Sequence, residues 1–285
     1  MPIKLEKVSY TYAPGTAHER TAVRDVSLDI ADGEYIGLMG TTGSGKSTLV
    51  QLMAGLIKPS SGSVLLDGED INSKKYDRSI LHRKVGLVFQ HPENQLFETT
   101  VERDVAFGLK HLKMSKEEKA EAVKAAIEQV GFDYEAVRTQ SPLSFSGGEK
   151  RRIALAGVLV EKPSVLIMDE PIAGLDSYSR AELLKLVNEL NAKGVTIIMI
   201  SHSADVLAEY ARRIIVLKDG VLIRDDSTKH IFSDYFDLIR HGLGVPQVRQ
   251  TVQLMRERGV DMPANVILYD QFIDRLKILM WRKSR

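Results

Sequence analysis

The sequence of 285 residues contains no cysteine, which excludes disulfide bridges and metal sites built on thiolates. Neither sign of charge is in excess, because the 39 Lys and Arg residues are balanced by 38 Asp and Glu residues. No basic field therefore indicates a nucleic-acid partner. Long apolar runs are also missing, and those at 165–168 and 197–200 fall far short of the roughly 20 residues that span a bilayer.

The first seven residues carry charges and form no apolar block, so we expect no signal peptide and a chain that stays in the cytosol. Hydrophobic residues make up 44% of the chain, which is enough for one full-sized domain with an appendage.

What the sequence does contain is a glycine-rich segment with the spacing G-x-x-x-x-G-K-[ST]. This pattern predicts a P-loop, in which backbone N–H groups surround phosphate oxygens. Lys46 should reach the β- and γ-phosphates, the Ser47 hydroxyl should ligate Mg²⁺, and the helix that follows should point its positive end at the anion. The predicted nucleotide-binding residues of this segment are Gly40, Thr41, Thr42, Gly43, Ser44, Gly45, Lys46, Ser47 and Thr48.

Continuous β-rich runs at 85–89, 165–168 and 196–200 are typical of parallel strands that are buried on both faces. A polar residue follows each run, in turn Gln90, Asp169 and the pair Ser201–His202. Because ligands bind at the carboxyl ends of strands in an open α/β sheet, we expect these residues to share one site.

The remaining segments predict the rest of an α/β fold. The alternating residues of 3–30 and the segment 64–66 indicate an antiparallel sheet, and residues 218–220 indicate a hairpin. We expect a nucleotide-binding domain over 1–232, with an inserted helical subdomain over about 91–160. A C-terminal helical extension over 233–285 should hold one helix between Pro246 and Gly259 and a second, very apolar one over 266–281.

The strand-end residues suggest an ATPase. Asp169 should contact Mg²⁺ directly or through water, and Glu170 is the natural base for activating water. Gln90 could position that water or touch Mg²⁺, and His202 could hydrogen-bond the γ-phosphate. Tyr12 fits either a core position or stacking on adenine, and nothing local separates the two.

Ser146, Gly147 and Gly148 leave a similar choice open. They suit a second phosphate-contacting helix terminus, at the head of a helix over 150–160, or a simple helix cap.

Taken in order, the P-loop, Gln90, residues 145–149, 167–170 and 173–176, and His202 resemble the full motif set of ATP-binding cassette (ABC) ATPases. The resemblance covers about residues 3–232 and implies a P-loop NTPase fold, with ATP and Mg²⁺ as ligands. It implies that Ser146, Gly147, Gly148 and Glu149 form a signature loop, which contacts the γ-phosphate bound to an opposing subunit. The other roles that it implies are a catalytic base at Glu170, a Walker B carboxylate at Asp169, a D-loop aspartate at Asp176 and adenine stacking by Tyr12.

Within that family, residues 8–12, 89–97 and 156–159 and the C-terminal extension resemble the energy-coupling factor ATPases. This implies a peripheral subunit on the cytoplasmic face of the cell membrane that drives vitamin or metal uptake. Its partners would be a second, different ATPase, a transmembrane coupling protein and a substrate-binding membrane protein, with no nucleic acid. Exposed Leu96 and Phe97 would form the groove for the membrane helices, unless that loop packs on its own domain.

Three residues depart from the usual motifs, namely Phe145, Glu149 and Ile172. Glu149 adds negative charge near a phosphate site, so we expect its composite site to be the weaker of two. Two other functions compete with transport: a soluble ABC-type ATPase acting on DNA or ribosomes, and a regulatory module without turnover. The presence of both Glu170 and His202 disfavours the regulatory module.

Overall fold

The computed structural model describes residues 3–283; residues 1–2 and 284–285, at the outer ends of the two expected domains, lie outside the described part. The strands are β1 (Ile3–Tyr12), β2 (Arg20–Ile30), β3 (Tyr35–Met39), β4 (Ser61–Leu66), β5 (Glu69–Asp70), β6 (Val85–Val88), β7 (Val165–Asp169), β8 (Thr196–Ile200), β9 (Arg213–Lys218) and β10 (Val221–Ser227). The helices are α1 (Lys46–Met53), α2 (Arg78–Lys84), α3 (Val101–Phe107), α4 (Lys116–Gln129), α5 (Tyr134–Val137), α6 (Gly147–Leu159), α7 (Ser177–Ala192), α8 (Ala204–Tyr210), α9 (Thr228–Ser233), α10 (Tyr235–Arg240), α11 (Gln247–Glu257) and α12 (Tyr269–Lys283), with 3₁₀ turns η1 (Pro92–Gln95) and η2 (Pro142–Ser144).

A six-stranded sheet forms the centre of the molecule, in the order β10-β9-β3-β8-β7-β6. Its strands are parallel except for β10, which pairs with β9 through the predicted hairpin. Every residue of β3 and β8 is buried, because apolar layers cover both faces of the sheet. The predicted parallel core is confirmed, and its carboxyl edge carries the residues of interest.

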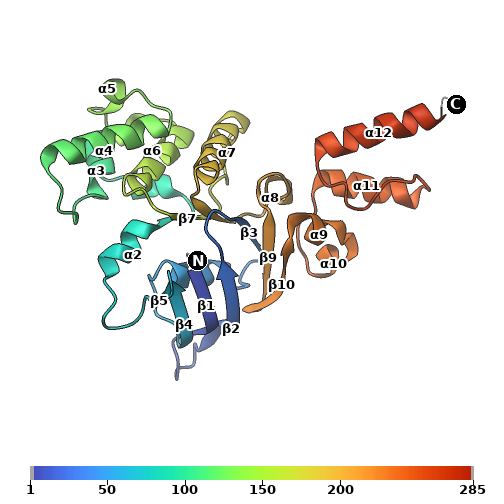
Figure 1. Ribbon diagram of the computed structural model, residues 1–285, viewed down its shortest axis with the longest axis horizontal. Helices are drawn as coiled ribbons and strands as arrows, with labels where there is room; N and C mark the ends of the chain where they lie inside the picture. Colours follow the sequence, from blue (N-terminus) through green and yellow to red (C-terminus); the bar gives the residue numbers. More distant parts are fainter. Residues whose placement is uncertain (1–2, 284–285) are drawn as a thin grey trace.

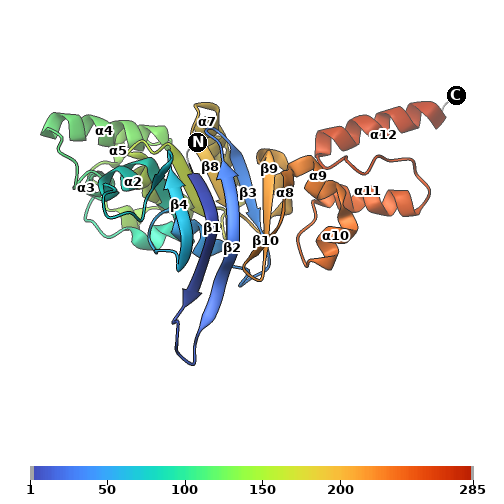
Figure 2. The same ribbon diagram turned by 60° about the horizontal axis from the view of Figure 1, so that its bottom comes forward.

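The N-terminal strands form a separate antiparallel sheet in the order β2-β1-β4-β5. Ile3 and Leu5 of β1 lie opposite Ile30 and Leu28 of β2, as the alternating pattern predicts. These side chains join α1 and one face of the central sheet in a common core. In Figures 1 and 2 this sheet lies beside the central sheet, with β1 and β2 forming its long hairpin.

The insertion between β6 and β7 folds into the helices α3 to α6, which gather at one end of the molecule (Figure 1). Ser115 and Glu118 cap α4 reciprocally, in the S-x-x-E arrangement of a capping box. Val123 and Ile127 of α4 are buried in the core that covers the second face of the central sheet.

The C-terminal helices α11 and α12 project from the opposite end of the molecule (Figures 1 and 2). The expectation of a second, very apolar helix over 266–281 is wrong in two respects. The helix begins at Tyr269, because Val266 and Ile267 are buried in a turn whose Ile267 N–H donates to the Gln271 side chain. It is also amphipathic, since Phe272 and Leu276 pack on a small cluster with α11 while the charged side chains of Asp274 and Lys277 are exposed. Among residues 3–283, no helix combines the length and apolarity needed to cross a bilayer.

Candidate active site

The P-loop connects β3 to α1 and depends on glycine for steric reasons. Gly40 and Gly45 have positive φ angles of 154° and 101°. A Cβ atom on Gly40 would collide with the carbonyl oxygen of Leu217, and one on Gly45 with that of Ala22. Both neighbours are backbone atoms, so a side chain at either position would force the loop out of shape.

Lys46 starts α1 with its side chain folded into the loop. Its Nζ donates to the carbonyl oxygens of Gly40 and Thr41, at 2.8 and 3.0 Å. Burial lowers the pKa of this ammonium group, while the nearby carboxylates of Glu170 and Asp169 act in the opposite direction. A cation and the N-terminus of an eight-residue helix thus meet at one point, a favourable arrangement for a phosphate group.

The expected gathering of strand-end residues is observed. Ser47 Oγ donates to Asp169 Oδ2 at 2.8 Å, which ties the P-loop to the end of β7. A hollow of about 550 Å³ opens at this point. Its lining includes Thr42, Gly43, Lys46, Ser47, Gln90, Asp169, Glu170 and His202.

The donor groups in this hollow suit Mg²⁺. The Ser47 hydroxyl, the Asp169 carboxylate and the Gln90 amide all offer hard oxygen ligands. Within residues 3–283 no cluster of three or more His, Asp or Glu side chains could hold a metal ion by itself.

Glu170 has the most unusual surroundings in the site. Its φ angle is 50°, a strained value for a residue with a side chain, and its N–H donates to the carbonyl oxygen of Ile200. Its Oε1 is buried without a hydrogen-bond partner, 3.7 Å from His202 Nε2. Burial raises the pKa of this carboxyl, with His202 acting in the opposite direction. Such a group is ready to accept a proton from water.

Tyr12 lies at the end of β1 and is 40% exposed, so the core alternative does not apply. Its hydroxyl is 3.1 Å from Thr48 Oγ1, and its ring packs edge-to-face on Tyr10. A second hollow, of about 180 Å³, lies between Tyr12 and the P-loop and includes Arg20 in its lining. An exposed ring beside the P-loop could stack on a base.

The signature segment forms a capping box. Ser146 accepts a hydrogen bond from Glu149 N–H, and Glu149 Oε2 accepts one from Ser146 N–H at 2.9 Å. The hydrogen bonds from Ser146 lower the pKa of Glu149, so this carboxylate is charged within its cap. The helix starts at Gly147, earlier than the expected 150, so Gly147 and Gly148 lie in its first turn.

Asp176 caps the neighbouring helix α7, accepting from the N–H groups of Tyr178 and Ser179 at 2.9 Å each. The hydrogen bonds from Ser179 lower the pKa of Asp176. Neither Asp176 nor the segment 146–149 lines the hollows beside the P-loop. The predicted site residues therefore form two groups that this chain does not bring together.

The sequence reasoning missed several arginines. Arg151 is buried on α6, and its guanidinium donates to the carbonyl oxygens of Pro171 and Ala173, at 2.8 Å each, and to Glu93. Burial acts to raise the pKa of Glu93, but the hydrogen bonds from Arg151 bring it below its ordinary value. Arg180 and Arg20 line the two hollows. No local signal marks these residues, because their partners are distant in sequence.

The expectation that Leu96 and Phe97 are both exposed is wrong for Leu96. Leu96 is only 8% exposed and joins the helical core, whereas Phe97 is 62% exposed. The cause is the extended backbone of Leu96, since neighbouring residues in extended chain point to opposite sides. Phe97 instead pairs with exposed Phe107, with ring centroids 4.9 Å apart.

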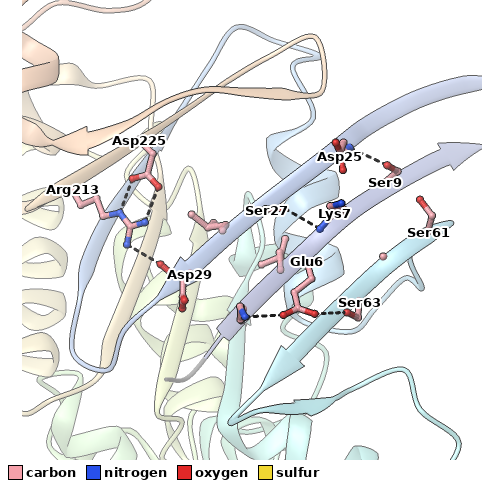
Figure 3. A pocket seen from close by; sticks show the side chains of 14 residues that line it. Glu6, Lys7, Ser9, Asp25, Ser27, Asp29, Ser61, Ser63, Arg213 and Asp225 are labelled. Atoms are coloured by element: carbon pink, nitrogen blue, oxygen red, sulfur yellow. Dashed lines mark hydrogen bonds and ion pairs between the residues drawn. The ribbon is translucent and has the colours of Figure 1, made fainter.

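A larger hollow, of about 1090 Å³, lies on the outer face of the antiparallel sheet (Figure 3). Its polar groups pair with one another: Ser9 accepts from Asp25 N–H, Ser27 accepts from Lys7 N–H, and Arg213 binds Asp225. It shares no lining residue with the hollows at the P-loop. Although this hollow is larger than those at the P-loop, it is therefore separate from the active site.

The parallel sheet, the P-loop and the two acidic residues at the carboxyl end of β7 define a P-loop ATPase. A model of the family described as ABC transporter matches residues 23–173. The chain belongs to the ABC transporter ATPases, and its near full-length similarity to curated relatives assigns it to the ATP-binding subunits of energy-coupling factor transporters. The predicted family and α/β P-loop fold are thereby confirmed, and action on DNA or ribosomes is not favoured.

Two of these relatives are the energy-coupling factor transporter ATP-binding proteins EcfA2 of Clostridium tetani and Symbiobacterium thermophilum. The first is 44% identical over 95% of this chain and 94% of its own length, and the second is 44% identical over 100% and 99%. Among solved structures, cbiO1 of Clostridium perfringens, part of the ABC transporter complex cbiONQ, is 35% identical with a TM-score of 0.74 over 90% of this chain and 96% of its own. The dimeric ATP-binding cassette MJ0796, bound to ADP and Pi, is 30% identical with a TM-score of 0.68 over 79% and 98%.

Proposed function

We propose that this chain binds ATP with Mg²⁺ and hydrolyses it as one of two ATPase subunits of an energy-coupling factor importer. The transporter takes up a vitamin or a metal ion, and the chain works at the cytoplasmic face of the membrane. The observation that carries the catalytic part is the buried, unpartnered Oε1 of Glu170 in the hollow that also holds Lys46 and His202.

The P-loop binds the phosphates of ATP. Lys46 exchanges its bonds to the carbonyl oxygens of Gly40 and Thr41 for bonds to phosphate oxygens, whose negative charge compensates the ammonium group for the hydration that it loses by burial. Tyr12 stacks on the adenine from the second hollow, and its bond to Thr48 fixes the orientation of the ring.

Ser47, Asp169 and Gln90 hold Mg²⁺. When bound, the ion neutralises charge that develops on the phosphate oxygens. Ser47 is oriented by its bond to Asp169, so the two oxygens already lie 2.8 Å apart.

Glu170 accepts the proton of the attacking water, and His202 holds the γ-phosphate from the end of β8. Two features of Glu170 support this role. Burial raises its pKa toward the range in which a carboxylate is an effective base, and its strained backbone is typical of functional residues. Arg180 and Gln90 line the same hollow and help to orient the water.

Ser146, Gly147, Gly148, Glu149 and Asp176 act on the ATP that is bound to a second ATPase subunit. The separation of this group from the P-loop of its own chain supports that arrangement. In a pair of different subunits, the charged Glu149 makes the composite site that it joins the weaker of the two.

The nucleotide-binding domain over 1–232 contacts the membrane partners through its helical subdomain over about 91–160, while helices α11 and α12 of the extension over 233–285 stand apart from that end (Figure 1). The exposed aromatic pair of Phe97 and Phe107 is the docking point for helices of a transmembrane coupling protein, which also carries a substrate-binding membrane protein. Large exposed aromatic side chains are typical anchors of interfaces.

The test is affinity purification of the full chain from detergent-solubilised membranes of its native cell, followed by mass spectrometry. We expect a multi-span membrane protein and a second P-loop ATPase. The double variant Phe97→Ala/Phe107→Ala should lose the membrane protein. The control Phe236→Ala, which removes an aromatic residue of 63% exposure on α10, should keep it. Recovery of soluble partners alone would refute the transporter, and full recovery with the double variant would refute the docking point.

A further inference from the structure

We propose that residues 241–247, which run from the end of α10 to the first residue of α11, position two segments of the site: the P-loop and the loop that carries His202. Through this segment, here called the strap, the C-terminal extension sets the rate of ATP hydrolysis in the site of its own chain. The inference rests on the proposed role of His202.

The strap lies directly against both nucleotide loops. A hollow of about 340 Å³ has Gly242, Leu243 and Gly244 on one side and Thr41 and His202 among the residues on the other. A Cβ atom on Gly242 would be 3.5 Å from Thr41 Cγ2, and one on Gly244 would be 3.3 Å from the carbonyl oxygen of His202. The extension therefore reaches the active site although its helices project away from it.

Three of the strap's hydrogen bonds, together with one buried side chain, tie it to α10, α11 and the His202 loop. Leu243 N–H donates to the carbonyl oxygen of Leu238 on α10, at 2.9 Å, and the Gln250 side chain of α11 donates to the carbonyl oxygen of Val245, at 2.8 Å. Val245 is buried in the main core. A movement of α10 or α11 is therefore transmitted to the strap.

The third bond joins the strap to the His202 loop. Gln247 N–H donates to Asp205 Oδ1 at 2.8 Å, and Asp205 lies in the first turn of α8, three residues after His202. Gly244 contacts the same short stretch of chain, because its Cβ would also lie 3.4 Å from that of Ala204. The strap thus holds the backbone after β8 at two points.

His202 depends on this support because its own side chain is held weakly. The imidazole is 62% exposed, and its Nε2 is 3.7 Å from Glu170 Oε1, beyond hydrogen-bond distance. The direction of the ring is set mainly by the backbone from which it extends. A shift of that backbone by a few tenths of an ångström changes the geometry at the γ-phosphate, where small misplacements are costly to the rate.

The first test is Gly244→Ala in the full chain, purified with its partner subunits. The added Cβ pushes on the His202 carbonyl oxygen, so we expect kcat for ATP to fall about tenfold while KM stays within about twofold. The matched control is Gly157→Ala, since a Cβ on Gly157 meets nothing within 4 Å. The control should hydrolyse ATP at the normal rate.

The His202→Ala background separates positioning from a general loss of structure. With the imidazole removed, Gly244→Ala should have little further effect on kcat. An equal tenfold loss in that background would overturn the inference. A normal kcat for Gly244→Ala in the presence of His202 would overturn it as well. If His202→Ala itself left hydrolysis unchanged, the proposed role of His202 would fail first.

A second pair of variants loosens the strap without adding bulk. Asp205→Ala removes the acceptor for Gln247 N–H and should also lower kcat with little change in KM, whereas Asp205→Asn keeps an acceptor oxygen and should restore it. Equal kcat values for the two variants would contradict the role of this bond. Thermal unfolding of each variant shows that the compared proteins are folded.

Discussion

Arg151 connects three parts of the site, and its replacement by methionine should lower the free energy of unfolding substantially. Its side chain is 4% exposed and makes four hydrogen bonds. Two go to Glu93, three residues after Gln90, and two go to the carbonyl oxygens of Pro171 and Ala173, shortly after Glu170. Methionine fills much of the same volume but removes the donor of both carbonyl oxygens and leaves the Glu93 carboxylate with the His91 ring, whose Nδ1 is 3.3 Å from Oε1, as its remaining side-chain partner. Breaking a buried ion pair in this way typically costs about 3–5 kcal/mol of unfolding free energy, a large part of the total for a domain.

The assay is urea unfolding of wild type, Arg151→Met and the control Arg152→Met. Arg152 is the next residue on α6 but makes one hydrogen bond, to the Val130 carbonyl oxygen, and lies over the Phe132 ring, so about 1 kcal/mol is expected for its loss. Equal losses of unfolding free energy for the two variants would show that the bonds of Arg151 to Glu93 and to the two carbonyl oxygens do not stabilise the fold.

The same ion pair has a pH signature. Because the pKa of Glu93 is lowered in the folded protein, its contribution is present above the unfolded pKa and is lost as pH falls through the folded pKa. The stability gap between wild type and Glu93→Gln should therefore shrink in acid. A gap that grew as pH fell would contradict the assigned direction of the shift.

The remaining predictions concern the nucleotide. Lys46→Ala should weaken ATP binding by on the order of 3 kcal/mol, about 100-fold in Kd by calorimetry, and an unchanged Kd would remove Lys46 from the phosphate site. Tyr12→Ala should weaken binding by about 1–3 kcal/mol while Tyr12→Phe stays near wild type, and equal losses would argue against stacking. Burial raises the pKa of Glu170, and a base must be unprotonated to act. As the pH is lowered, kcat should therefore begin to fall at a pH above the usual pKa range of glutamate. A fall of kcat only at or below that range would contradict this prediction.

Much of the fold follows from local pattern. The buried runs of β3 and β8 and the glycines of the P-loop leave few alternatives, because parallel strands need apolar residues on both faces and the loop needs positive φ angles. The gathering of Gln90, Asp169 and His202 followed from strand direction alone.

Other features depend on tertiary contacts that no local pattern encodes. Leu96 and Phe97 are adjacent and both apolar, and only the extended backbone after η1 sends one into the core and the other to the surface. Arg151 resembles any helix-surface arginine until Glu93 is brought beside it, 58 residues away along the chain. The position of the strap at the active site could not be predicted either, because Gly242 and Gly244 are typical of an ordinary loop between helices.

The most direct test of the account is the rate of ATP hydrolysis by the Glu170→Gln variant, measured together with its affinity for ATP. Glutamine keeps the size of the side chain but cannot accept the proton of water. We expect ATP to bind with nearly unchanged Kd, hydrolysis to fall by about 10²-fold or more, and the two ATPase subunits to be trapped in a closed complex. Hydrolysis at the wild-type rate would contradict the assignment of Glu170 as the base and, with it, the mechanism derived from this site.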